Sequence, residues 1–189
     1  ISKLGWIKRQ IKSFESQPRQ SARELITGES HYYLGRRYLL DVSYTQGRPA
    51  VELKNKKFLV LYVNETTTLA QREKLLSEWY RKEMKKLLPA IIGKWESKTG
   101  LKVNSCRVKK MKTKWGSCNP EHKRIWLNLE LVKKPIHCLE YIVVHEMTHF
   151  IERTHNERFT AYLDTAMPQW RTYKNQLGQL PLADEIWQI

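Results

Sequence analysis

The feature that most constrains this chain is an H-E-M-T-H pentapeptide at residues 145–149, set inside an apolar run. On a helix, residues four apart share one face, so the imidazoles of His145 and His149 can converge on one metal ion. Glu146 lies roughly 60° around the helix from His149 and points into the same space. Apolar residues at 142–144 and 150–151 predict a buried helix, which would hardly bury two histidines and a glutamate without compensation. The pattern therefore predicts two metal ligands and a base.

A third ligand requires the helix to end. A continuous helix would carry His155 about 9 Å beyond His149, at about 1.5 Å per residue. Thr154 and Asn156 are suitable places for a break, and Asn156 followed by Glu157 is typical of an N-cap with an acid in the first turn of a new helix. We therefore expect His155 at a corner between two helices, turned back toward the metal. Three protein ligands leave one tetrahedral position for water, as in catalytic rather than structural zinc sites.

Other motifs surround the pentapeptide in a fixed order: M-K-T-K-W-G-S-C at 111–118, I-W-L-N-L-E-L at 125–131, E-Y-I-V-V-H-E at 140–146 and H-N-E-R-F at 155–159. Together they resemble the YgjP-like metallopeptidase family, which belongs to the zincins and is related to the SprT-like and WLM proteases. The resemblance implies a zinc-dependent peptidase, with His145, His149 and His155 as zinc ligands and Glu146 as general base. It implies no particular substrate. Glu152 stands where metzincins have glycine, which separates the chain from that group.

Two other functions are compatible with the residues. The same activated water, together with many lysines, would suit a metal-dependent nucleotide or phosphoanhydride hydrolase, although the sequence contains no P-loop. A non-enzymatic, basic nucleic-acid-binding module would instead contain structural zinc. Such a closed site needs a fourth protein ligand, for which Cys118 and Cys138 are the candidates.

The charge of the chain is unusual for a small enzyme. Its 189 residues carry a net charge of +15, and the pI is about 9.8, which favours attraction to polyanions. The densest basic stretch runs from Lys102 to Lys114, and its six positive residues are accompanied by no acid. If this stretch is a strand, Lys110, Lys112 and Lys114 share one face. That face would be either an ordinary solvated surface or a contact for nucleic acid or an acidic substrate.

Membrane insertion and a disulfide framework are both disfavoured. No run approaches the roughly 20 apolar residues that span a bilayer. The three cysteines have no recognisable zinc-finger spacing and suit a reducing compartment, so a cytoplasmic location is expected.

The order of patterns predicts an α+β, zincin-like fold in two parts. Residues 1–65 should hold a short basic amphipathic helix within the first 16 residues, followed by a small antiparallel β meander between residues 30 and 65. Residues 66–189 should form the zincin-like domain, and the two parts should make one compact unit. A helix over 67–88 is expected to stop or kink at Pro89, and the metal helix should run from Pro135 to about Arg153.

The metal helix should pack on an antiparallel sheet. Strands near 102–114 and 124–131 are expected to form its hairpin, with turn residues around Gly116 and at 119–120. In a zincin, an edge strand can pair with an extended peptide, and the strand over Ile125–Leu129 is the candidate, with ordinary sheet structure as its alternative. Three donors near the third histidine could stabilise an oxyanion: Arg158, Tyr162 and Tyr173.

Overall fold

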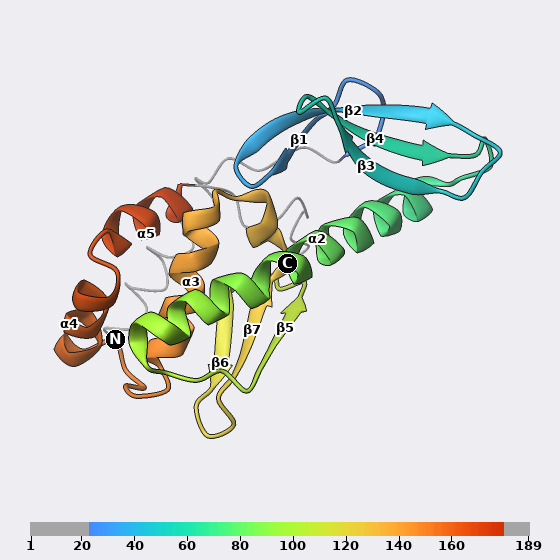
Figure 1. Cartoon of the computed structure of the whole chain (residues 1–189). Coiled ribbons are helices and arrows are strands. Elements are labelled where there is room, and N and C mark those ends of the chain that lie inside the picture. Colours follow the sequence, from blue (N-terminus) through green and yellow to red (C-terminus); the bar gives the residue numbers. More distant parts are fainter. Residues whose placement is uncertain (1–22, 180–189) are drawn as a thin grey trace, which may run out of the picture.

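The computed structural model describes residues 23–179, so the basic helix expected within the first 16 residues lies outside the described part. A four-stranded sheet forms one end of the molecule, and a long helix runs from it across a second, three-stranded sheet and three shorter helices (Figure 1). The elements are β1 (Ser30–Tyr33), β2 (Arg36–Tyr44), β3 (Ala50–Lys54), β4 (Phe58–Val63), α2 (Leu69–Thr99), β5 (Ser105–Lys109), β6 (Gly116–Asn119), β7 (Arg124–Asn128), the 3-10 helix η1 (Leu129–Lys133), α3 (Ile136–Thr148), α4 (Glu157–Ala166) and α5 (Trp170–Gly178).

The first sheet is mixed, so the expected antiparallel meander is wrong. Its strand order is β1-β2-β4-β3, and β4 pairs in parallel with β2 and antiparallel with β3. Strand β4 is a continuous apolar run in which Leu59, Leu61 and Val63 are at most 1% exposed. Such a run suits a central strand. Strand β3 alternates between exposed and half-buried residues and occupies the edge.

Helix α2 passes through Pro89 without ending, so of the two expectations for this residue the stop is wrong and the kink stays a prediction. Thr68 caps it, and a capping box joins the Thr68 and Gln71 side chains to backbone amides at the helix start. Proline removes one helical hydrogen bond at a cost of about 3 kcal/mol. A buried stripe on both sides of the proline offsets this cost: Leu76, Tyr80, Met84, Leu88, Ile91 and Trp95.

The second sheet has the order β5-β7-β6, with β7 parallel to β5 and antiparallel to β6. The hairpin therefore consists of β6 and β7 alone. Strand β5 follows α2 in the chain and pairs with the other side of β7. Ile125 and Leu127 on β7 are fully buried on the face against which α3 packs. Because β7 is central, the expected edge strand over Ile125–Leu129 is wrong, and β6 is the edge nearest α3.

The turn between β1 and β2 docks against the start of the metal helix. The Leu34 amide donates to the Val132 carbonyl at 2.9 Å, and the Gly35 amide donates to the Lys133 carbonyl at 3.2 Å. Gly35 has a φ of +78°, and a Cβ there would lie 2.8 Å from Cγ of Pro135, the residue that precedes α3. This close approach ties the first sheet to the helix that carries the candidate site.

The described chain is an α+β protein, as expected from the sequence. Within residues 23–179, no helix is both long and apolar enough to cross a membrane.

Candidate metal centre

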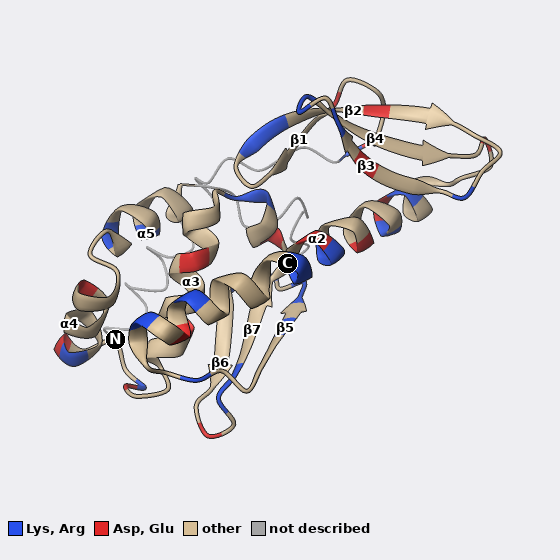
Figure 2. Cartoon of the chain, viewed as in Figure 1, with Lys and Arg blue, Asp and Glu red and all other residues tan. Residues whose placement is uncertain are grey.

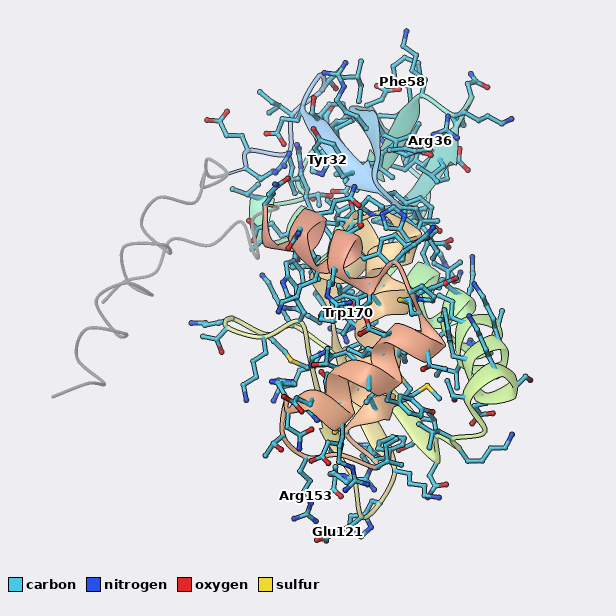
Figure 3. The ribbon with its side chains drawn as sticks, turned by 90° about the vertical axis from the view of Figure 1, so that its left-hand side faces the viewer. Tyr32, Arg36, Phe58, Glu121, Arg153 and Trp170 are labelled. Carbon is cyan, nitrogen blue, oxygen red and sulfur yellow. The ribbon has the colours of Figure 1, made fainter. Side chains whose placement is uncertain are left out.

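Helix α3 positions the first two histidines. Its apolar residues are packed into the core, where Leu139, Val143, Val144 and Met147 are fully buried. His145 lies in the last turn, and His149 is the residue at which the helix ends. Trp170 supports this end of α3: its ring stacks on Tyr141, whose ring in turn meets the edge of His145. Trp170 lies near the centre of the molecule in Figure 3.

The helix ends at Thr148, about one turn earlier than Arg153, the expected end. Tight turns follow, in which the Phe150 amide donates to the Met147 carbonyl at 3.0 Å. The His149 Nδ1 lies 3.0 Å from the carbonyl oxygen of Glu152, a geometry in which Nδ1–H donates. This bond turns the chain back and orients the His149 ring.

The corner between α3 and α4 holds His155 as the sequence predicts. The Glu152 carboxylate accepts hydrogen bonds from the Thr154 amide at 3.3 Å and the Thr154 hydroxyl at 3.1 Å. The Asn156 side chain accepts from the Phe159 amide at 3.0 Å and caps α4. His155 stands between these two anchored residues.

Three histidine Nε2 atoms converge at this corner. The Nε2 of His155 lies 3.1 Å from that of His145 and 3.0 Å from that of His149. One ligand nitrogen from each ring lies within 4.8 Å of the others. Phe159 is buried beneath them, with its ring centroid 4.7–5.0 Å from each imidazole. Phe159 therefore belongs to the core under the cluster.

The chemistry of the three rings fits a metal ion. Burial, together with the neighbouring His149, His155 and Lys174, lowers the pKa of His145 to about 3, so its ring is neutral at pH 7. Because His149 donates through Nδ1, its Nε2 presents a lone pair to the cluster. Ligand bonds of about 2.0–2.1 Å in a tetrahedral zinc site place neighbouring nitrogens about 3.4 Å apart, close to the observed spacing.

Glu146 lies against β6. It is 5% exposed, and burial raises its pKa to about 7, while a hydrogen bond from the Cys118 thiol and the charge of Lys114 oppose this rise. A Cβ on Gly116 would lie 2.6 Å from Oε1 of Glu146, so β6 passes directly over this carboxylate. A carboxyl group with a pKa near 7 can both accept and return a proton at neutral pH.

The three expected oxyanion donors have other partners. The Tyr162 hydroxyl donates to the Thr99 carbonyl at 3.2 Å, and the Tyr173 hydroxyl bonds Gln169. Arg158 is exposed and interacts electrostatically with Glu152. None of these contacts directs the three donors to the histidine cluster.

Sequence reasoning gave two neighbours of the site, Gly116 and Cys118, other roles and missed a third, Lys174. Gly116 and Cys118 contact Glu146, and Lys174 on α5 acts electrostatically on His145 and His155. The W-G-S-C motif singled out the first two, but a four-residue polar strand carries no hydrophobic alternation that would reveal its position. Lys174 is an exposed residue of α5 and has no distinguishing signal in the sequence.

The remaining titratable residues lie outside the cluster. Among residues 23–179, one group of His, Cys, Asp or Glu side chains could hold a metal ion, and it consists of the three histidines. Neither Cys118 nor Cys138 therefore supplies a fourth ligand. His122 is exposed, and His137 is half-buried against Tyr173.

Two comparisons with known proteins found a match. A family model described as YgjP-like, metallopeptidase domain matches residues 1–180. A crystal structure of the metallopeptidase zymogen of Pyrococcus abyssi abylysin matches 47% of this chain and 90% of that chain, with 15% sequence identity and a TM-score of 0.44. No curated protein matches the chain.

Proposed function

The chain belongs to the YgjP-like metallopeptidase family, and from this premise we propose that it is a zinc peptidase whose water is activated beside Glu146. Membership makes the chain a metal-dependent peptidase. The finer assignment takes His145, His149 and His155 as the zinc ligands. The convergence of their Nε2 atoms, with two spacings of 3.0 and 3.1 Å, is the observation that carries it. Three imidazoles favour zinc over harder divalent ions.

Glu146 performs the proton transfers in this proposal. When bound, zinc lowers the pKa of a coordinated water and polarises the substrate carbonyl. Glu146 accepts the proton of the attacking water and then passes it to the leaving amine. Its raised pKa supports both steps, and the Cys118 thiol and Gly116 hold its carboxylate in one position.

The substrate is proposed to be an extended peptide paired with the free edge of β6. This replaces the strand over Ile125–Leu129, which lies in the middle of the sheet. Strand β6 is an edge strand and adjoins Glu146 through Gly116, so a peptide added there would have its backbone next to the base. We place the reaction in the cytoplasm, which is supported by three free cysteines.

The test compares two variants on the same helix. Glu146→Gln should bind zinc with the stoichiometry of the wild type and melt at a similar temperature, yet lose peptide cleavage by at least about 10²-fold. Glu140→Gln is the matched control, because Glu140 pairs with Lys94 on the surface, away from the cluster. Equal activity of Glu146→Gln and the wild type would refute the assignment.

The other two functions have no comparable support. A nucleotide hydrolase would be favoured if the wild type turned over nucleotides and cleaved no peptide. A structural-zinc module would need a fourth protein ligand, and the described cluster contains three histidines alone.

A further inference from the structure

Within residues 23–179, one face of the second sheet is covered and the other is open. Ile125 and Leu127 on β7 point toward α3, as do their register neighbours Gly116 and Cys118 on β6. Side chains alternate along a strand, so the residues between them point the other way. We call this the open sheet face; it consists of Ser105 and Arg107 on β5, Arg124 and Trp126 on β7, and Ser117 and Asn119 on β6. None of these six residues is buried, and none is acidic.

The open sheet face combines cations with an aromatic ring. The Arg124 Nε–H donates to the Ser105 hydroxyl at 3.2 Å, and the Arg124 guanidinium lies 5.6 Å from the centre of the Trp126 ring. Arg107 is exposed and stands next to Trp126 in the register. Trp126 does not pack against the hydrophobic core of residues 23–179, whereas Trp115 does. Among the residues that the structure describes, a tryptophan between two arginines on this face therefore has no evident packing role.

A basic loop forms one rim of this face. Strand β5 ends at Lys109, so the lysines expected to share a strand face, Lys110, Lys112 and Lys114, lie in the following loop instead. These three lysines and Lys109 are exposed. The buried Asn128 side chain fixes the loop by donating to the carbonyls of Met111 and Lys114, both at 2.8 Å. Basic residues thus lie at both ends of the sheet (Figure 2).

Strands β5, β6 and β7 carry no acidic residue. Glu121, in the turn between β6 and β7, pairs with Arg153 at 3.5 Å. Both lie at the end of the molecule far from the first sheet (Figure 3). The positive charge of the open sheet face is therefore not balanced by neighbouring carboxylates on its own strands.

We propose that the open sheet face binds single-stranded nucleic acid. Arg107, Arg124 and the rim lysines match the spaced phosphates of a polyanion, and Trp126 offers a flat ring on which an unpaired base can stack. An acidic protein would match the positive charge but would offer no base to stack on the Trp126 ring. A membrane surface would require apolar side chains for insertion, and the open sheet face has no aliphatic residue.

Apart from Lys114, whose charge acts on Glu146, this surface is separate from the metal centre. Ser117 lies on the open sheet face, whereas its neighbours Gly116 and Cys118 face Glu146. Nucleic acid would therefore lie on the sheet face that points away from Glu146, whereas the peptide would pair with the edge of β6. Substitutions of Arg107, Arg124 and Trp126, which lie on β5 and β7, should leave basal peptide cleavage unchanged.

Fluorescence anisotropy of a labelled oligothymidylate tests the proposal. The wild-type zinc protein should bind with an affinity that falls steeply with salt, and less tightly to a duplex of equal length. Arg107→Glu/Arg124→Glu should weaken binding more than about tenfold and lower the slope of log K against log salt by about 1.4, from two contacts of about 0.7 each. Trp126→Ala should weaken binding about tenfold, and Trp126→Phe should retain most of the affinity. Zinc content and peptide cleavage report that each variant is folded.

The control reverses the same number of charges on a competing basic surface. A depression along α2 is lined by Glu78, Arg81, Lys82, Lys85 and Lys86. Lys82→Glu/Lys85→Glu should keep at least half of the affinity. The proposal is overturned if this pair abolishes binding, if the arginine pair has no effect, if salt has no effect, or if polyglutamate displaces the protein as well as unlabelled oligothymidylate does.

Discussion

Gly116 is the position at which a single methyl group should separate catalysis from metal binding. A Cβ at this site would lie 2.6 Å from Oε1 of Glu146, 2.8 Å from Cγ2 of Ile142 and 3.0 Å from Cγ of Glu146. Ordinary contacts begin at 3.4 Å, so the carboxylate oxygen must move by 0.8 Å, the difference between 3.4 and 2.6. Glu146 is 5% exposed, and the surrounding core leaves it little room to adjust.

Gly116→Ala should therefore lower kcat for peptide cleavage on the order of 10²-fold, because a displacement of about 1 Å in a reacting group has an effect of this size. Zinc stoichiometry should not change, since the three histidines lie on α3 and on the corner before α4. Stopped assays with a quenched fluorescent peptide, alongside metal analysis of the same sample, measure both quantities.

Gly93→Ala is the matched control. Gly93 lies inside α2, and a Cβ there would meet no atom within 4 Å. This variant should keep full activity and gain about 0.5–1 kcal/mol of stability, because alanine loses less backbone entropy than glycine in a helix. If Gly116→Ala cleaves peptide within about twofold of the wild type, Glu146 is not held by β6 in the way described.

Three further predictions concern stability. Burial lowers the pKa of His31 from 6.5 to about 4, so the contribution of its neutral ring to stability is complete above pH 6.5 and is lost as the pH falls toward 4, by about 3 kcal/mol in all. Urea titrations at pH 7 and pH 4.5 should show a smaller loss of unfolding free energy for His31→Gln than for the wild type, and equal losses would contradict the burial. Asn128→Ala should lower the free energy of unfolding by about 2–3 kcal/mol, because it leaves the carbonyls of Met111 and Lys114 without their buried donors; a loss below about 0.5 kcal/mol in denaturant titrations would contradict this. Removing the metal by chelation should abolish peptide cleavage and lower the melting temperature, and adding zinc back at about 100 times its Kd should restore about 2.7 kcal/mol; a melting temperature that does not respond to zinc would argue against a site in the folded protein.

The candidate site could be predicted largely from local spacing. The i, i+4 relation of His145 and His149 is a property of any helix, and Asn156 followed by an acid marks the start of α4. Both relations involve residues close in sequence. The early end of α3 could not be predicted, because it depends on the bond between the His149 ring and the Glu152 carbonyl, which forms only once the chain has turned.

Strand pairing was less predictable than strand location. The apolar run of β4 was recognised as a strand, but its place between β2 and β3 depends on burial over both faces. Strand β6 has only four half-buried residues, so its role as the edge beside Glu146 arises from contacts distant in sequence. Pro89 is a similar case, in which tertiary packing of α2 outweighed a local helix-breaking signal.

The central claim is that three imidazoles hold one zinc ion and leave a position for solvent. A crystal structure of the zinc-loaded protein, with anomalous scattering measured at the zinc edge, tests it most directly. We predict one peak with the Nε2 atoms of His145, His149 and His155 at about 2.0–2.1 Å and a water as the remaining ligand. A peak elsewhere, or a fourth bond to the Cys118 sulfur, would contradict the account.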